Sequence, residues 1–393
     1  MGVCRLSGLD GSNPLAFLAA LGTLRVLDAA WPTRDVRLHW LDESVWTPEL
    51  AFSGEATRDE VVAALVELLG GTPPSDEPSR RSLARKEKDA QPSLAQVRRK
   101  AKDTLKKAKK AAEVEGKERG LKGAALRAFV SDQIADAKAA ADEADAAARE
   151  HIAGSAGPPQ YALDDVIGVP GSTFREFALR AVEVAHGARD SKPGSCPDWS
   201  GFVASYGSEA VCDKDGRVSP TPLSFLNGAG GKCLLKTCRE LAASTTAMHI
   251  TRSLFETWTY QDERLALRWD PADDRRYALR WGDPSADAAG TEWGAGRVAV
   301  EALPLFPCAP TRAGLVATGW RPGKQGLEFT WPIWQPCLSI TVVQSLLGLE
   351  ELSRPHPNRA ELEAMGVREV FRASRAVVGK NVYFSGAVPA PGE

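Results

Sequence analysis

Several patterns that mark common protein classes are missing from this chain of 393 residues. Its seven cysteines include no Cys-x-x-Cys pair, and an odd number of scattered cysteines is typical of reduced thiols. The longest apolar run, residues 14–31, is interrupted by Gly22, Arg25 and Asp28, so it falls short of the roughly 18 apolar residues of a membrane-spanning helix. The first residues do not resemble a secretory signal. We therefore expect a cytoplasmic protein.

Motifs of the common catalytic classes are also missing. The nearest approach to a phosphate-binding loop, Gly231-Lys232, has Leu226 at the first glycine position and Cys233 at the hydroxyl position. No Gly-x-Ser-x-Gly is present, and no two of the five histidines are three or four residues apart, as local metal ligands would be. The glycine-rich segment 227–231 is either a connector or an anion-binding loop before a helix. We predict a protein without catalytic activity, cofactor or metal.

The charge of the chain is unevenly distributed. Hydrophobic residues make up 43% of the chain and charged residues 25%, which is typical of a folded globular protein. The formal net charge is −2, but the segment from Arg80 to Arg127 holds 17 Lys and Arg against 6 Asp and Glu. That segment carries a net charge of +11, and the rest of the chain carries −13. The basic segment is therefore the first candidate for contact with an anionic partner.

The chain begins with a predicted α/β part of the core, residues 1–74. A turn over residues 9–13 precedes Pro14, which suits the first position of a helix, and the helix that follows is apolar around most of its circumference. A strand over residues 36–41 and an amphipathic helix over residues 60–69 come next. Pro, Ser and charged residues from Thr72 to Arg81 mark a boundary.

We predict that residues 75–157 form an inserted antiparallel helical hairpin, a coiled coil. Apolar or small residues of the first arm recur at intervals of three and four at Leu94, Val97, Ala101, Thr104, Ala108 and Ala111. After a break at residues 116–123, the second arm continues with Leu126, Val130, Ile134, Ala137, Ala141, Ala144 and Ala148. The second arm is acidic, so the two arms attract each other electrostatically.

Residues 158–393 are predicted to be an α+β main body, which makes the whole chain α+β with mixed helices and β-hairpins. The repeated Ala-Leu-Arg-Trp at residues 266–269 and 278–281 predicts a β-hairpin. Further along the chain we expect a helix over 294–303, a strand over 327–333, a helical run over 338–349 and a short helix over 358–365.

Two basic groups are candidate nucleic-acid-binding residues. The first group lies on the first arm of the hairpin: Arg98, Arg99, Lys100, Lys102, Lys106, Lys107, Lys109 and Lys110. A helical row of this kind can follow a phosphate backbone, and it is equally typical of a solvated surface balanced by an acidic neighbour.

The second group lies near the C-terminus: Arg368, Arg372, Arg375 and Lys380. In a helix the three arginines share one face, whereas in a strand Arg375 lies opposite the other two. Tryptophans beside basic residues, such as Trp269, Trp281 and Trp320, either stack on bases or pack in the core.

Separate stretches of the sequence resemble accessory proteins of type I-G (formerly I-U) CRISPR systems. The longest runs from Gly8 to Gly22, Gly-Leu-Asp-Gly-Ser-Asn-Pro-Leu-Ala-Phe-Leu-Ala-Ala-Leu-Gly. The others are residues 267–271 with 274–277, 301–307, 329–334 and 378–380. Members of this family are described as an extension of the Cas helicase-nuclease or as similar to the large subunit of Cascade.

The resemblance implies a cytoplasmic, non-catalytic component of antiviral defence that contacts effector subunits, the helicase-nuclease, and DNA or crRNA. In such complexes guide pairing reads the sequence, while protein subunits read backbone and shape. Two alternatives remain open. One is a nuclease or nucleotide-dependent enzyme whose site is assembled from distant residues such as Asp10, His39 and Lys380. The other is a protein–protein scaffold that uses the hairpin as a docking arm.

Overall fold

The computed structural model describes residues 1–69, 94–154, 158–187, 199–226, 232–273, 290–324, 326–378 and 381–392. The chain divides into two compact units, Met1–Pro74 with Gly157–Glu393, and Ser75–Ala156. We call the first the main unit and the second the arm. The arm boundaries predicted from the sequence were 75 and 157. Within the described ranges, no helix combines the length and apolar character needed to cross a bilayer.

Helix α1 (Pro14–Ala30) is the centre of the main unit. The Asn13 side chain accepts hydrogen bonds from the backbone N–H groups of Leu15 and Ala16, and Pro14 takes the first helical position. Almost every side chain from Pro14 to Leu27 is buried, as predicted for a helix that is apolar around most of its circumference. Helix α11 (Trp293–Val300) packs directly on α1.

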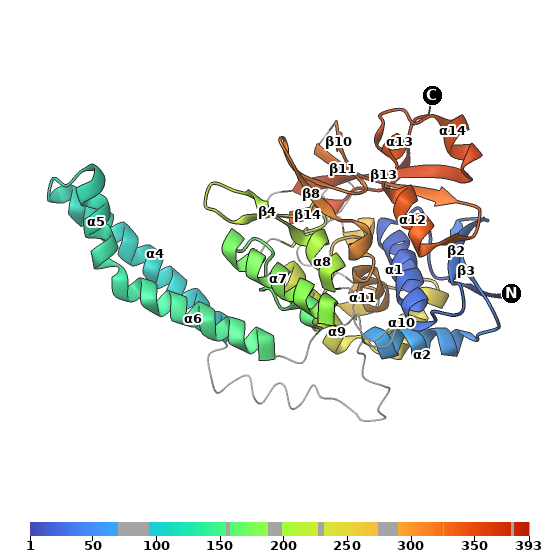
Figure 1. Ribbon diagram of the computed structural model, residues 1–393, viewed down its shortest axis with the longest axis horizontal. Helices are drawn as coiled ribbons and strands as arrows, with labels where there is room; N and C mark the ends of the chain where they lie inside the picture. Colours follow the sequence, from blue (N-terminus) through green and yellow to red (C-terminus); the bar gives the residue numbers. More distant parts are fainter. Residues whose placement is uncertain are drawn as a thin grey trace, which may run out of the picture. The chain divides into compact units, whose positions relative to one another are not determined.

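Two antiparallel sheets pack around α1 (Figure 1). The first has the order β1-β3-β2-β12, from Gly2–Arg5, Trp46–Phe52, Arg37–Asp42 and Leu338–Ser339. The second has the order β10-β11-β13-β14, from Trp320–Gly323, Gly326–Trp334, Val367–Val378 and Asn381–Phe384, and β15 (Val388–Pro389) also pairs with β13. The Phe17 ring of α1 contacts Trp40 of β2 and both Trp331 and Trp334 of β11. One aromatic cluster therefore joins the central helix to both sheets.

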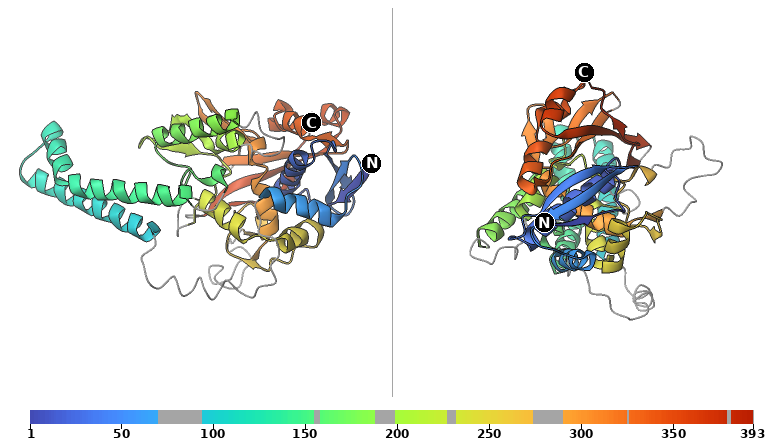
Figure 2. Two further views of the ribbon diagram at one scale, coloured as in Figure 1. Left: turned by 60° about the horizontal axis from the view of Figure 1, so that its bottom comes forward. Right: turned by 90° about the vertical axis from the view of Figure 1, so that its right-hand side faces the viewer.

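Further helices and small hairpins complete the main unit (Figure 2). The helices are α2 (Arg58–Leu69), α7 (Gly171–Gly187), α8 (Trp199–Tyr206), α9 (Leu234–Ser244), α10 (Ala247–Phe255), α12 (Ile340–Leu347), α13 (Glu350–Ser353) and α14 (Arg359–Ala364). The two-stranded pairs are β4 with β5 (Gly207–Cys212, Val218–Pro220), β6 with β7 (Asp262–Glu263, Gly290–Thr291) and β8 with β9 (Cys308–Thr311, Gly314–Ala317). The fold is α+β, as predicted.

The predicted hairpin of two Ala-Leu-Arg-Trp repeats is wrong for its first strand. Residues 264–270 are irregular and lead into a short 3-10 helix, Pro271–Asp273, while the second repeat lies outside the described residues. Arg264, Leu265 and Arg268 have positive φ angles, which no regular strand permits. Trp269 is fully buried and donates a hydrogen bond to the Leu223 carbonyl. The alternating residues favoured a strand, but in the structure Trp269 is buried in an irregular segment instead.

The arm contains three helices, α4 (Leu94–Glu118), α5 (Gly123–Gln133) and α6 (Ala135–Gly154), and α4 contacts the other two. Within the arm, α4 runs in one direction and the chain turns back through α5 and α6 (Figure 1). The second arm is thus two helices with a break at Ile134, and the predicted coiled coil is not confirmed. In α4 the less exposed positions include Leu105 and Ala112, while Thr104 and Ala111 are exposed. The inward face is therefore rotated from the predicted one.

Candidate nucleic-acid interface

Helix α4 presents two chemically different sides. Its residues are mainly Ala, Lys, Leu and Glu, which favour a helix. The inward positions are Ala101, Leu105, Ala108, Ala112 and Gly116, and Leu126 and Phe129 of α5 approach Gly116 closely. A side chain at residue 116 would collide with Leu126, so this glycine permits close packing of the two helices. Packing against α5 and α6 thereby determines which side of α4 faces outward.

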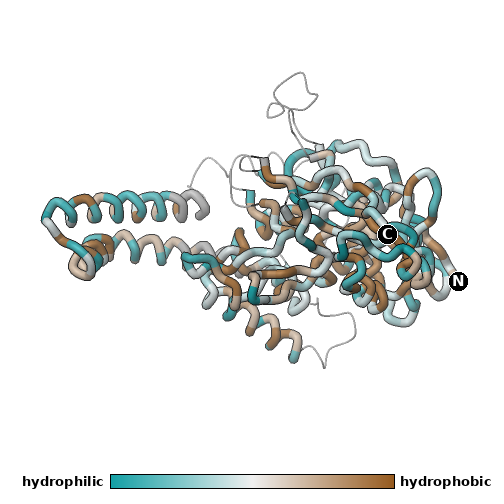
Figure 3. Tube along the Cα trace, turned by 90° about the horizontal axis from the view of Figure 1, so that it is seen from above, coloured by the Kyte–Doolittle hydropathy of each residue, from teal (hydrophilic) through white to brown (hydrophobic). Residues whose placement is uncertain are grey.

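The lysines of α4 lie on the outward side. Successive residues are rotated by about 100° around a helix axis. This places Lys100, Lys106, Lys107 and Lys110 on the side away from the inward positions, and Lys102 and Lys109 at its edge. Lys100, Lys102, Lys106, Lys107, Lys109 and Lys110 are all exposed. Figure 3 shows the hydrophilic residues of this helix in teal. The result is a row of cations along one side of the helix.

Four of these lysines form no direct ion pair with any residue that the structure describes. Among the described residues, no ion pair joins Lys106, Lys107, Lys109 or Lys110 to a carboxylate of α6 or of any other element. The predicted electrostatic attraction between the two arms stays a prediction. Exposed lysine heads in this arrangement can contact phosphates and release counterions.

Arg98 and Arg99 belong to α4, but their side chains lie outside the described ones, and Lys380 lies outside the described residues altogether. The other C-terminal candidates are in strand β13, which decides between the helix and strand alternatives. Arg368 is exposed and donates to the Gln335 side chain.

Arg372 and Arg375 bind backbone carbonyls instead of facing solvent. Arg372 is buried and donates to the carbonyls of Leu352, Arg354 and Pro355, which closes the C-terminal end of α13. Burial is the main cause that lowers the pKa of Arg372 to about 10. Arg375 donates to the carbonyls of Pro222 and Ser224. These two arginines are therefore engaged in the fold. The candidate residues that the structure shows exposed are the lysines of α4 in the arm and, separately, Arg368 in the main unit.

The tryptophans that were possible stacking platforms belong to the core where they are described. Trp269 has 0% of its surface exposed and Trp320 has 9%. Trp320 stacks on Phe384 with 5.9 Å between ring centroids. Trp281 lies outside the described residues. Base stacking on Trp269 or Trp320 would require the core to open.

The residues of the alternative enzyme hypothesis have separate neighbours. Both carboxylate oxygens of Asp10 accept hydrogen bonds from Ser12, and His39 Nε2 lies 3.2 Å from Glu49 Oε1 across strands β2 and β3. No hydrogen bond or ion pair joins Asp10 to His39 in the described part of the molecule. The same part contains no group of three or more His, Cys, Asp or Glu side chains placed to hold a metal ion.

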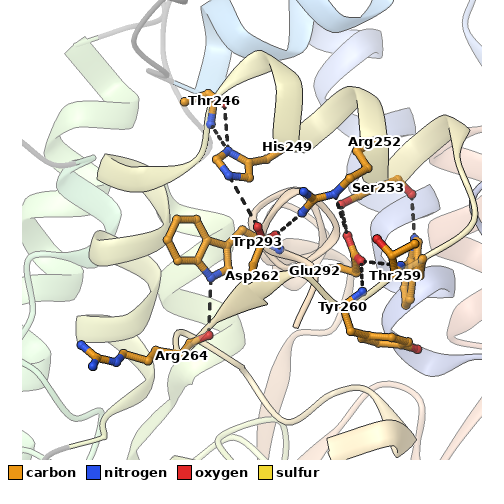
Figure 4. Close-up of polar contacts among 11 residues, drawn as sticks. Thr246, His249, Arg252, Ser253, Thr259, Tyr260, Asp262, Arg264, Glu292 and Trp293 are labelled. Atoms are coloured by element: carbon orange, nitrogen blue, oxygen red, sulfur yellow. Dashed lines mark hydrogen bonds and ion pairs between the residues drawn. The ribbon is translucent and has the colours of Figure 1, made fainter. Parts of the chain in front are cut away.

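A polar cluster between α10, β6 and the start of α11 was missed at the level of sequence (Figure 4). Arg252 donates to Asp262 Oδ2 at 2.6 Å and lies 3.6 Å from Glu292 Oε2. Glu292 is almost fully buried and accepts from Ser253 and from the backbone N–H groups of Thr259 and Tyr260. These residues come from three separate segments and share no motif, so only the fold reveals them.

His249 lies at the edge of this cluster. Its Nδ1 accepts from the backbone N–H of Thr246, and its Nε2 lies 3.6 Å from Asp262 Oδ1. Burial lowers the pKa of His249, and this effect outweighs the opposite effect of Asp262. The polar groups of the cluster are satisfied mainly by one another, which is typical of a structural network rather than of an open site.

Stretches that carry the resemblance to the CRISPR accessory family meet around the N-terminus of α1. Trp331 donates from its indole nitrogen to the Gly11 carbonyl at 2.8 Å. Asn13 donates to Asp270 Oδ1 at 3.1 Å. These stretches therefore contact one another in the fold, and the contacts do not indicate a catalytic role for them. Comparisons of the chain with protein-family models, with curated proteins and with solved structures find no match.

Proposed function

We propose that the protein binds the backbone of a nucleic acid through the outward side of α4, as a non-catalytic component of a type I CRISPR interference system. The observation that carries the binding is the group of four exposed lysines on α4, Lys106, Lys107, Lys109 and Lys110, which form no ion pair with a carboxylate among the described residues. A cationic row without an aromatic platform contacts phosphates and does not read bases. Binding is therefore expected to be strongly salt-dependent and indifferent to sequence.

The resemblance of the sequence supports the wider role. It points to effector subunits and the helicase-nuclease as protein partners, and to target DNA or crRNA as the nucleic acid. A guide complex needs subunits that hold the backbone while base pairing supplies specificity. The proposed location is the cytoplasm, where such complexes meet foreign DNA.

The decisive experiment replaces four lysines at once in the full-length protein, K106Q/K107Q/K109Q/K110Q. Glutamine is nearly as good a helix former as lysine, so α4 should be retained. Binding to double-stranded DNA, single-stranded DNA and RNA is measured from 50 to 300 mM salt. If the four lysines neutralise four phosphates, the slope of log K against log salt for duplex DNA should become shallower by about 3 to 4.

The matched control removes four exposed lysines outside α4, K122Q/K138Q/K214Q/K324Q, and changes the net charge equally. We expect the control to keep most of the salt slope, because its lysines do not form the row on α4. Equal slopes for the two variants would show that only total charge matters. An unchanged slope in the α4 variant, with binding intact, would remove α4 from the interface.

A further inference from the structure

We propose that α4 also binds a second copy of this chain, as an antiparallel pair of helices centred between residues 112 and 113. This inference does not depend on nucleic-acid binding. It rests on an open, shallow face of α4, here called the groove, which is formed by Lys107, Lys110, Ala111, Val114, Glu115 and Glu118.

The groove runs along a side of α4 that the arm itself leaves uncovered. Val114 has 50% of its surface exposed, and Ala111 is exposed beside it. Lys107, Ala111, Val114 and Glu118 follow one another at intervals of four, three and four residues, which is the spacing of a face that packs on another helix. The inward face, which includes Leu105 and Ala112, is a different one and is occupied by α5 and α6.

The order of these residues is self-complementary in the antiparallel direction. Lys107 and Glu118 lie equally far from the midpoint of the groove, and so do Ala111 and Val114. A two-fold axis through that midpoint places Lys107 of one copy opposite Glu118 of the other, twice. It also places Ala111 opposite Val114, twice, between the two ion pairs.

The same arrangement excludes a parallel pair. In a parallel pair every residue faces its own copy, so Lys107 would face lysine and Glu118 would face glutamate, and both contacts repel. Neither Lys107 nor Glu118 has an ion-pair partner among the described residues of its own chain. Both side chains are therefore available to a second copy.

The contact is short. Helix α4 ends at Glu118, so the two helices overlap over residues 107–118, about 18 Å at 1.5 Å per residue. Such a contact belongs to the class of small, weak interfaces. Lys106 and Lys109 lie outside the groove, so self-association leaves part of the cationic row accessible.

Charge reversal on the full-length protein tests this pairing by sedimentation velocity over a concentration series at low salt. K107E and E118K should each weaken self-association by about tenfold or more, because each converts two attractions into two repulsions. The double variant K107E/E118K should recover it, and an equimolar mixture of the two single variants should also associate. K138E and E143K, exposed positions on α6 outside the groove, serve as controls and should associate like the unmodified protein.

The result that overturns the proposal is a monomer at every concentration for the unmodified protein, or single variants that associate as strongly as the controls. Failure of the double variant to recover association would reject the antiparallel pairing. E118K retains every lysine of the row, so loss of self-association in this variant with intact nucleic-acid binding would separate the two proposals.

Discussion

Asn13 and Asp270 are 257 residues apart in the sequence and joined by a hydrogen bond of 3.1 Å. Asn13 uses its side-chain oxygen to cap α1 and its amide nitrogen to hold Asp270, so one side chain performs both tasks. Asp270 Oδ1 also accepts from the backbone N–H of Ala272. The start of the central helix is thereby tied to the segment that follows the irregular residues 264–269.

Replacing Asp270 by asparagine should stabilise the protein at neutral pH. Burial raises the pKa of Asp270, because the charged carboxylate is poorly solvated there. A carboxyl whose pKa is raised in the folded state loses stabilisation as the pH rises through that pKa. D270N keeps an oxygen acceptor without the charge, so its midpoint of thermal unfolding should exceed that of the unmodified protein at pH 7.

The difference between D270N and the unmodified protein should shrink as the pH approaches the ordinary carboxyl pKa of about 4. N13A provides the comparison, since it removes both the cap and the hydrogen bond and should destabilise at either pH by about 1 kcal/mol or more. A lower midpoint for D270N at pH 7 would show that the charged form is favoured at this site.

Gly22 is required by the crossing of α1 and α11. A Cβ atom at residue 22 would lie 1.9 Å from the carbonyl oxygen of Val298, which is backbone and cannot rotate away. We expect G22A to reduce the free energy of unfolding by about 3 kcal/mol, the upper range for overpacking in a core. Urea denaturation followed by circular dichroism measures this change.

The control for G22A is G348A. Gly348 has an ordinary helical backbone conformation at the end of α12, and an added Cβ would meet only carbonyl oxygens at 3.6 Å or more. Its effect should stay within about 0.5 kcal/mol. Equal effects of the two substitutions would contradict the tight helix crossing.

Arg297 and Glu301 form a buried ion pair inside the main unit. Arg297 Nη1 lies 2.7 Å from Glu301 Oε1, and Arg25 Nη1 lies 3.2 Å from Glu301 Oε2. R297M should lower the free energy of unfolding by about 3 to 5 kcal/mol, because it leaves a buried carboxylate with too little compensation. Chemical denaturation of R297M, E301L and the double variant forms a double-mutant cycle.

The double variant R297M/E301L should be more stable than R297M, since it removes the uncompensated charge. Additive losses in the double variant would show that the two side chains act independently, contrary to the contact between them.

His249 should make the protein sensitive to mild acid. Its pKa is lowered in the folded state, mainly by burial, so the unfolded chain binds a proton more readily. Stability should therefore fall as the pH decreases below about 6.5, the ordinary histidine pKa, and continue to fall down to the pKa of the folded state. Protonated His249 would face Arg252, Asp262 and Glu292, of which only the carboxylates attract it.

The test compares H249N with H356N between pH 7.5 and 5 by thermal unfolding. Asparagine can accept the hydrogen bond from Thr246 but cannot take up a proton, so H249N should show a smaller loss of stability in acid. His356 is exposed, and H356N should follow the unmodified protein. Identical pH profiles for all three proteins would remove His249 as the cause.

Local signals in the sequence predicted much of the secondary structure. Asn13-Pro14 and the apolar residues after them predicted α1, and Asn358 caps α14 as expected from a helix over residues 358–365. The strand predicted at 327–333 is β11 (Gly326–Trp334). The helical run predicted from residue 338 begins two residues later, since Leu338–Ser339 pairs with β2. Helix caps, proline positions and hydrophobic periodicity involve residues only a few positions apart, so they can be recognised directly in the sequence.

The rotation of α4 could not be predicted in the same way. Intervals of three and four favoured Thr104 and Ala111 as inward residues, whereas the structure turns Leu105 and Ala112 inward. The second arm breaks into α5 and α6, and the two helices together meet a different side of α4 than one straight helix would. Ala101 and Ala108 belong to both the predicted and the observed series, so spacing alone does not choose between Thr104 and Leu105 as the residue between them.

The sequence by itself determined the α+β class, the lysine-rich helix and the apolar character of α1, because these follow from residue types at short spacing. Tertiary structure alone decided that Arg372 and Arg375 bind carbonyls, that Trp269 and Trp320 lie in the core, and that Asp262 and Glu292 share Arg252. The physical reason is that burial and charge pairing depend on tertiary contacts between segments far apart in the sequence, and local residue patterns do not specify those contacts.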